Sequence, residues 1–508
     1  MNKRTRLLAA SLFSLLAIPT LAACSSSTDS GGAAGSSNAG SGSATGGASG
    51  AVGTGGSKAG GAGSGAGGSS PGAAGSIATT GGGGGITATA GAGGAGGGAT
   101  GVAGSGAGGS SAGGATGSAG SAGSGAGGGG SSIKCVLPTL PEGNSLPAKQ
   151  KLPDPFTFFD GTKVTTKEQW ECRRREILAM AAKYIYGPVP STPDEVTGTV
   201  SGGTVSITAK VGSKSETFSA SISGSGSVIA LELSGGIFPS GRKKLSFGSG
   251  FETKIKSLFG IAELNTNVAN GWMIDRVMDV LEKNPSSGHD PQKIMVSGCS
   301  GCGKGAFLAG VFSRAPLVVI VESGGGGAAN LRQAEWFRHG DGKAMWQCDS
   351  PPQSIDNLED NGICGPWVTG AASWLRTAPA KVYNLPIDQH LLLATIAPRY
   401  LLHFSNNNGK NSWCHLGGTC EALSAWAAKP VWKALGVPER MGFHMYSAGH
   451  CSAPAEATNL AAEFFKRAFE GSTTAKTDVM NIMDNGVQQP VSAWKGMWVD
   501  WDMEAVLK

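Results

Sequence analysis

A long stretch of small residues decides which part of this chain can fold into a compact domain. From Ser25 to about Ser132 the sequence is almost entirely Gly, Ala and Ser, and this stretch holds more than half of the protein's 85 glycines. It has too few apolar side chains to bury a hydrophobic core, so we expect a flexible linker with an end-to-end distance of roughly 50–60 Å. The folded domain must therefore lie C-terminal to it.

The N-terminus indicates export from the cytoplasm. Basic residues at positions 3, 4 and 6 precede an apolar stretch from Leu7 to Leu21, and Ala22-Ala23-Cys24 follows. This pattern is typical of a signal peptide and is too short for a lasting transmembrane helix. Leu-Ala-Ala-Cys is also typical of bacterial lipoproteins, so we expect lipidation of Cys24 and a membrane anchor at the cell surface or in the periplasm. The alternative is a secreted protein whose Cys24 leaves with the signal.

Composition divides the chain into four regions: a signal peptide, 1–23; the linker, 24–132; a domain of ordinary composition, 133–471; and a C-terminal tail, 472–508. The net charge of +5 is spread over the chain and forms no basic run with interleaved aromatic residues, so nothing indicates a nucleic-acid partner. Nine of the ten cysteines lie in the domain. In an exported protein this indicates disulfides, and the odd number leaves at least one thiol without a partner in the chain.

Within the domain, predicted strands alternate with predicted helices. Early segments rich in Val, Ile and Thr alternate apolar and polar residues and predict strands, at 197–211, 216–224 and 227–236. Continuous apolar runs predict buried strands, at 293–298, 316–322, 399–405 and 441–449. Helical patterns lie at 270–283, 304–312, 387–396 and 421–435, and a long irregular stretch spans 323–385. This order predicts an α/β fold with a mostly parallel central sheet in a three-layer αβα sandwich.

The segment "MVSGCSGCGKGAF", 295–307, fits two different motifs. Gly298 followed by Gly303-Lys304 is close to the phosphate-binding P-loop, but that loop needs a Ser or Thr where this chain has Gly305. Ser300, in a glycine-rich turn after a predicted strand, fits a nucleophile elbow, G-x-S-x-G, except that Cys302 stands at the last glycine. The local pattern favours the elbow, and export from the cytoplasm, where ATP is found, favours it further.

Three residues with complementary chemistry follow three predicted strands. Ser300, Glu322 and His450 each come just after a strand, where active sites of parallel sheets lie. A serine nucleophile needs a base to take its proton and a third group to orient that base. The chain order Ser–acid–His is that of α/β-hydrolases. We therefore predict a catalytic triad, although each residue alone is equally compatible with a structural role.

Two cysteines flank this proposed triad. Cys299 directly precedes Ser300, and Cys451 directly follows His450. A disulfide between them would hold nucleophile and base together at the edge of the sheet, and a chain-entropy model gives it about 5 kcal/mol. The alternative is that both thiols are unpaired or have other partners.

From Cys135 to about Gly471 the sequence resembles the glucuronoyl esterases of carbohydrate esterase family 15. The segments that carry the resemblance include "LPDPFTFFDGTKVTTKEQWECRRREI", "VSGCSGCGKGAFLAG", "VESGGGGAANLR", "LPIDQHLLLATIAPRYLL" and "GHC". The resemblance implies an α/β-hydrolase fold and a serine esterase with a Ser-His-Glu triad and neither metal nor cofactor. It implies hydrolysis of the ester between 4-O-methyl-D-glucuronic acid of glucuronoxylan and lignin alcohols.

The resemblance also implies positions for substrate binding and for disulfides. Lys304 matches a lysine that contacts sugar hydroxyls, Trp413 a tryptophan that lines the sugar site, and Gln347 and Asp356 match two glucuronate-binding residues in a loosely matched region. The implied disulfides are Cys135–Cys172 and Cys299–Cys451. A third family disulfide would use Cys420, but Asn330 stands at its partner position, and Cys348–Cys364 is one possible remaining pair.

One departure from the family lies beside the nucleophile. The family has an arginine after the serine that is thought to help hold the oxyanion, whereas this chain has Gly301, which offers only its backbone N–H. We expect a monomer. Because the arginine is missing, we also expect a slow glucuronoyl esterase unless another group replaces it, either a backbone N–H pair or Arg332, although Arg332 matches an arginine that the family already has, which favours a structural role. The alternatives are an acetyl or aryl esterase and a carbohydrate-binding protein that has lost catalysis.

Overall fold

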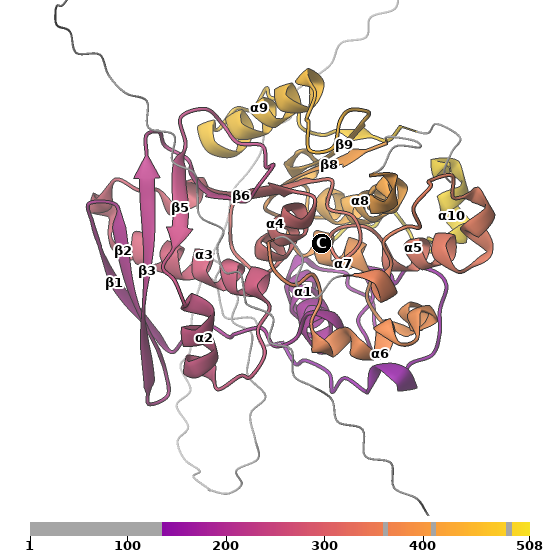
Figure 1. Cartoon of the computed structure of the whole chain (residues 1–508), viewed down its shortest axis with the longest axis horizontal. Coiled ribbons are helices and arrows are strands. Elements are labelled where there is room, and N and C mark those ends of the chain that lie inside the picture. Colours follow the sequence, from indigo (N-terminus) through magenta and orange to yellow (C-terminus); the bar gives the residue numbers. More distant parts are fainter. Residues whose placement is uncertain (1–134, 359–363, 408–412, 484–489) are drawn as a thin grey trace, which may run out of the picture. The chain divides into compact units, whose positions relative to one another are not determined.

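The computed structural model describes residues 135–358, 364–407, 413–483 and 490–508. The predicted signal peptide, Cys24 and the linker lie outside the described residues. Within the described residues, ten strands form one sheet in the order β1-β2-β3-β5-β4-β6-β7-β8-β9-β10 (Figure 1). The strands are β1 Glu195–Ser201, β2 Thr204–Val211, β3 Lys214–Gly224, β4 Ile229–Glu232, β5 Lys243–Phe247, β6 Ile294–Cys299, β7 Leu317–Val321, β8 Tyr400–Asn406, β9 Met441–Tyr446 and β10 Met480–Asn481.

The sheet is parallel where the proposed triad lies and antiparallel at its other end. All pairings from β5 through β4 and β6 to β10 are parallel, whereas β1, β2, β3 and β5 pair antiparallel with one another in turn. The predicted strand 197–211 is therefore two strands of a hairpin. Its turn, Gly202–Gly203, has positive φ at both residues, and a Cβ on Gly203 would lie 2.5 Å from the Ile222 carbonyl oxygen.

Helices cover both faces of the parallel strands because successive side chains point to opposite faces. In β7, Val319 packs in one apolar cluster with Phe464 of helix α9, whereas Val318 and Ile320 pack in the larger cluster on the other face. The α-helices are α1 Lys167–Ala181, α2 Phe251–Phe259, α3 Thr266–Lys283, α4 Gly301–Val311, α5 Leu331–Arg338, α6 Ser373–Arg376, α7 Gln389–Ala394, α8 Gly418–Ala434, α9 Ala455–Glu470 and α10 Trp494–Met497. This is the predicted three-layer α/β-hydrolase architecture.

Several elements were missed in the sequence. Helices α1, α2 and α9 and strand β5 had no prediction, and the stretch 323–385 contains α5 and α6 rather than only irregular chain. The residues after Gly471 join the domain, since β10 pairs with β9 and Trp494 and Trp498 are buried in the main core. None of the described helices is long and apolar enough to cross a membrane.

Four disulfides connect the described residues, and the structure contains both predicted pairs, Cys135–Cys172 and Cys299–Cys451. The suggested pair Cys348–Cys364 is wrong, because Cys302 bonds to Cys364 and Cys348 bonds to Cys414. Cys420 is buried with a free thiol. Asn330, which stands at the expected position of a partner cysteine, is next to it: the Asn330 N–H donates to the Cys420 carbonyl oxygen at 3.0 Å.

Candidate active site

Ser300 occupies a strained turn between strand β6 and helix α4. Its backbone has φ 60° and ψ −125°, a conformation that costs a non-glycine residue of order 1–3 kcal/mol and is concentrated at functional sites. Two glycines let the turn close. A Cβ on Gly298 would lie 2.2 Å from the Cys302 carbonyl oxygen, and one on Gly303 would lie 2.5 Å from the Val321 carbonyl oxygen. The geometry is that of a nucleophile elbow whose second glycine is residue 303, not 302.

Lys304 is oriented differently from a P-loop lysine, which reaches toward phosphates. Its side chain is fully buried, and its Nζ donates to the Ser323 carbonyl oxygen and, at 3.0 Å, to Gln353 Oε1. The ammonium also lies 4.4 Å from the centre of the Trp367 ring. These contacts place Lys304 one helical turn beyond Ser300, beside the segment that follows Glu322, and they favour the elbow over the P-loop.

Glu322 follows strand β7 and is held by three donors besides the proposed base. It is 1% exposed and has φ 44°, a second strained residue at the same edge of the sheet. Its Oε1 accepts hydrogen bonds from Tyr446 Oη at 2.7 Å, Asn406 Nδ2 at 3.2 Å and the Cys451 N–H at 3.3 Å. Burial and the nearby carboxylate raise the pKa of Tyr446, so its hydroxyl stays protonated and donates. These three hydrogen bonds hold Glu322 in place independently of His450.

His450 completes the pair with Glu322. Its Nδ1 lies 2.7 Å from Glu322 Oε2, which leaves Nε2 as the nitrogen available to a serine proton. The disulfide Cys299–Cys451, with a Cα–Cα distance of 5.8 Å, joins the residues that flank Ser300 and His450. The described hydrogen bonds include none between Ser300 Oγ and His450, and such nucleophile–base bonds are often long without substrate.

Trp413 covers one face of this histidine. The indole stacks on the His450 imidazole with ring centres 4.0 Å apart and an angle of 14° between the planes, and it is 43% exposed. The disulfide Cys348–Cys414 anchors the residue next to it. The structure thus places Trp413 at the proposed base, with its exposed surface available to a ligand.

The two residues predicted to bind glucuronate, Gln347 and Asp356, have no described contact with Lys304, whereas Gln353 has one. Gln353, which the sequence did not single out, contacts Lys304, and its N–H donates to the His415 carbonyl oxygen at 2.8 Å. Gln347 is exposed. Asp356 is paired with Arg338, the last residue of helix α5, at 2.9 Å and lies 3.3 Å from His339, which follows the helix. Gln353 is therefore a better candidate for substrate contact than Gln347 or Asp356, and it was missed because its region matched the family only loosely.

Two groups of side chains in the described part of the chain have a spacing that a metal ion could use, and both contain residues with other partners. Ligand atoms of Glu335, His339 and Asp356 lie within 4.8 Å of one another, but Asp356 is ion-paired with Arg338. The other group combines His450 with Cys299 and Cys451, whose sulfurs are joined in a disulfide.

Glu421 of helix α8 supports the segment that follows Glu322. Its carboxylate is 1% exposed and accepts hydrogen bonds from Ser323 Oγ at 2.6 Å, the Gly324 N–H at 2.9 Å, His403 Nε2 at 3.2 Å and Ser405 Oγ at 2.6 Å. Burial alone would raise the pKa of Glu421, but the hydrogen bonds and the charge of His403 outweigh it and lower the pKa. A charged Glu421 thus holds Ser323 and Gly324, which directly follow the proposed acid, and the Ser323 carbonyl oxygen is the partner of Lys304.

Gly301 and Arg332 differ in their ability to donate to an oxyanion. Gly301 is the first residue of helix α4, where backbone N–H groups have no partner within the helix. Arg332 is 1% exposed, and its guanidinium is bound to Asp388 at 3.0 Å and to the carbonyl oxygens of Lys149, Leu385 and Ile387. Arg332 is thus a structural residue, and Gly301 remains the candidate donor.

Comparisons with known proteins agree with this geometry. The family model for glucuronyl esterases of fungi matches residues 248–436. A 4-O-methyl-glucuronoyl methylesterase from Schizophyllum commune is 32% identical over 402 residues, which cover 73% of this chain and 94% of that protein. A 4-O-methyl-glucuronoyl methylesterase from Neurospora crassa is 35% identical over 329 residues, which cover 60% of this chain and 79% of that protein.

Solved structures show the same similarity. The glucuronoyl esterase catalytic domain from Hypocrea jecorina matches with a TM-score of 0.60 and 28% identity, covering 72% of this chain and 100% of that one. A mutant glucuronoyl esterase from Sporotrichum thermophile, in complex with methyl 4-O-methyl-beta-D-glucopyranuronate, matches with a TM-score of 0.58 and 29% identity. The match covers 71% of this chain and 97% of that one. Because this chain spans nearly all of the Schizophyllum protein at more than 30% identity, it belongs to the glucuronoyl esterases of carbohydrate esterase family 15.

Proposed function

We propose that this protein is a serine esterase that hydrolyses esters of 4-O-methyl-D-glucuronic acid, including those between glucuronoxylan and lignin alcohols. The observation that carries the proposal is the joining of Ser300 and His450 through the Cys299–Cys451 disulfide, with His450 bound to Glu322 at 2.7 Å. A carbohydrate-binding protein has no need for a strained serine beside a carboxylate-oriented imidazole. The relatives named above supply the substrate class.

The reaction begins at Ser300. Its Oγ attacks the carbonyl carbon of the uronate ester while His450 Nε2 takes the hydroxyl proton. Glu322 holds the imidazole through Nδ1 and stabilises the imidazolium that forms. The carbonyl oxygen becomes an alkoxide, and the Gly301 N–H at the start of helix α4 is the proposed donor to it.

Collapse of the tetrahedral intermediate breaks the bond to the alcohol, and His450 gives the proton to that leaving oxygen. The uronoyl group is then bonded to Ser300 as an ester. Water attacks this acyl-enzyme by the same steps in reverse order: His450 takes a proton from water and returns it to Ser300 Oγ. The products are the free uronic acid and the alcohol, and no cofactor enters the balance.

Lys304, Gln353 and Trp413 are the proposed sugar contacts. Lys304 Nζ donates a hydrogen bond to Gln353 Oε1, so the two side chains hold each other in place for contact with a sugar hydroxyl. Trp413 combines an exposed ring with its stacking on His450, so it can cover the apolar face of a sugar ring next to the reacting carbonyl.

The decisive experiment compares benzyl and methyl esters of glucuronic acid with an acetylated xylan as substrates. We expect hydrolysis of both glucuronate esters and little release of acetate. Ser300→Ala should abolish turnover, and His450→Ala or Glu322→Ala should lower kcat strongly, with double variants little worse than Ser300→Ala alone because the residues act as one unit. Near-normal turnover by Ser300→Ala would exclude the mechanism, and preferential acetate release would exclude the substrate assignment.

The protein acts outside the cytoplasm, as its four disulfides indicate. We propose in addition that residues 1–23 are removed, that Cys24 carries a lipid anchor, and that the linker to residue 132 lets a monomeric catalytic domain reach its insoluble substrate. Cys24→Ser should release the esterase from the membrane fraction. Equal membrane retention of that variant would rule out the anchor.

A further inference from the structure

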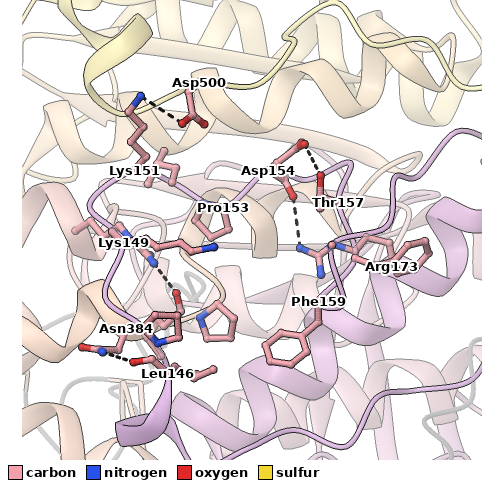
Figure 2. Close-up of a pocket in the computed structure, with 17 residues that line it drawn as sticks. Leu146, Lys149, Lys151, Pro153, Asp154, Thr157, Phe159, Arg173, Asn384 and Asp500 are labelled. Carbon is pink, nitrogen blue, oxygen red and sulfur yellow. Dashed lines mark hydrogen bonds and ion pairs between the residues drawn. The ribbon is translucent and has the colours of Figure 1, made fainter.

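A pocket whose lining includes none of the triad residues lies between the first described segment and helix α1. It has a volume of about 440 Å³, within the range of about 300–1,000 Å³ found for small-molecule sites. Its walls come from residues 146–161, from Arg173 of α1, from Arg332 of α5, from 384–386 and from Asp500. Figure 2 shows Lys149 and Arg173 on opposite sides of this pocket.

The walls are fixed without a ligand. Glu176 accepts hydrogen bonds from the Phe159 N–H at 3.2 and 3.1 Å and from Arg173 Nη1, so it joins the segment to helix α1. Asp154 accepts from the Phe156 N–H at 2.8 Å and from Lys163 Nζ at 2.8 Å. A pocket of this kind is largely pre-formed, which reduces the entropy lost on binding.

Most of the charged residues of the lining already have partners. Arg173 is paired with Glu176, Arg332 with Asp388 at 3.0 Å, and Asp154 with Lys163 at 2.8 Å. Lys151 is paired with Asp500 at 3.2 Å. Lys149 is exposed, and its amine has no ion pair or hydrogen bond within the described part of the chain, although its carbonyl oxygen is held by Arg332 Nε at 3.1 Å. Lys149 is therefore the cation that remains available to an anion.

Arg173 supplies an independent indication of a ligand. It is 2% exposed, and its Nε has no hydrogen-bond partner among the described residues. Its Nη2 reaches only the Asp154 carbonyl oxygen, at 3.5 Å. A buried N–H without a partner costs about 1–3 kcal/mol, so a small shift of this side chain that brought Nε to an acceptor in the pocket would recover that energy.

The remaining lining suits the apolar face of a sugar ring. Leu152, Pro153, Phe158, Phe159 and Pro386 form much of the wall. Aromatic and proline rings pack against the C–H groups of a pyranose, while Thr157 and Asn384 offer polar groups at the rim. An anionic monosaccharide combines both requirements: a carboxylate for the two cations and a flat apolar face for the rings.

We propose that this pocket binds a free, non-esterified uronate residue of the same polysaccharide that carries the ester, and so serves as an accessory site that holds the polymer. The proposal rests on the proposed function for the identity of the polymer. Lys149 would pair with the carboxylate, and Arg173 Nε–H would donate to a carboxylate or hydroxyl oxygen. The esterase would then bind partly esterified glucuronoxylan at two points, which increases its affinity for the polymer without affecting the chemistry.

Calorimetric titration of the full-length protein with a xylo-oligosaccharide bearing 4-O-methyl-glucuronic acid tests the site. We expect two sites per molecule in the wild type and one in Lys149→Glu, whereas Lys244→Glu, an exposed lysine of β5 outside the pocket, should retain both. Lys149→Gln should raise the Kd of the accessory site by about tenfold, and added salt should weaken it. A single site in the wild type, or two unchanged sites in Lys149→Glu, would overturn the proposal.

Kinetics separate this site from the catalytic one. Lys149→Glu should leave kcat and KM on benzyl glucuronate unchanged and raise KM several-fold on partly methyl-esterified glucuronoxylan. On fully esterified polymer, which has no free uronate, variant and wild type should agree. An equal KM on partly esterified polymer would count against the accessory site. Failure of the wild type to hydrolyse any glucuronate ester would instead overturn the proposed function. The titration would then still test whether the pocket binds a uronate.

Discussion

Two glycines of helix α4 provide a matched test of the nucleophile elbow. Gly303 and Gly305 are both buried in the same helix, two residues apart, and neither has positive φ. A Cβ on Gly303 would lie 2.5 Å from the Val321 carbonyl oxygen, which is backbone of strand β7. A Cβ on Gly305 would lie 2.9 Å from Asn267 Oδ1 and 3.1 Å from Leu233 Cδ1, which are ends of side chains that can move.

The expected magnitudes follow from these contacts. Real Cβ atoms essentially never approach closer than 3.0 Å, so Gly303→Ala must push the first turn of α4 from β7 by about half an ångström or more. Overpacking of this kind costs about 1–3 kcal/mol, against which alanine in a helix gains up to about 1 kcal/mol. Ser300 moves with that turn, and a displacement approaching 1 Å can cost about a hundredfold in rate. We expect kcat to fall between tenfold and a hundredfold.

Gly305→Ala serves as the control, and we expect it to keep its stability within about 1 kcal/mol and its kcat within a few-fold of wild type. Unfolding in urea gives the free energies, and hydrolysis of benzyl glucuronate gives kcat and KM for each variant. The reasoning would be refuted if Gly303→Ala were as active and as stable as wild type. It would also fail if both alanine variants lost activity equally, because the close approach to β7 would then not be the cause.

Three further outcomes are expected. Glu421→Gln should lower the free energy of unfolding by about 2–3 kcal/mol at neutral pH. Because the folded-state pKa of Glu421 is lowered, the stability that its charge provides is present above the ordinary pKa of 4.5 and is lost as the pH falls through the folded-state pKa. A difference in unfolding free energy between variant and wild type that does not change with pH would contradict this. Replacing Cys299 and Cys451 together with alanine should destabilise the fold by up to about 5 kcal/mol and lower kcat, measured by urea unfolding and ester hydrolysis; full activity would show that the disulfide does not position the triad. Gly301→Arg should raise kcat on glucuronate esters at similar KM, by up to about 10²–10³-fold if an oxyanion donor is missing, and an unchanged kcat in a folded variant would show that backbone groups already suffice.

The parallel half of the fold could be predicted because its strands are continuous apolar runs that end in polar residues. Strands β6 to β9 and helices α3, α4, α7 and α8 lie close to their predicted ranges. Helix α1 was missed because its sequence, with Arg173 and Glu176 buried as an ion pair, shows only a weak apolar stripe. Pattern analysis assumes that charged residues face solvent, and α1 violates that assumption.

The triad residues could be proposed from order and placement alone, but their supporting contacts could not. Tyr446 and Asn406 reach Glu322 from β9 and β8, and such a set depends on how three strands align rather than on a local motif. Gln353 was missed for a related reason. It lies in irregular chain whose path is set by the Cys348–Cys414 disulfide and by the hydrogen bond to the His415 carbonyl oxygen, and neither has a sequence signature.

Residues 301 and 302 differ in how they can support the elbow. Gly301 offers only its backbone, whereas Cys302 is bonded to Cys364. This disulfide joins the first turn of α4 to the segment whose Trp367 lies over Lys304 at 4.4 Å. Gly303 acts as the elbow glycine because a Cβ there would lie 2.5 Å from the Val321 carbonyl oxygen of β7. The turn therefore requires close approach to β7 at residue 303, whereas residue 302 carries a disulfide that ties the first turn of α4 to the segment of Cys364.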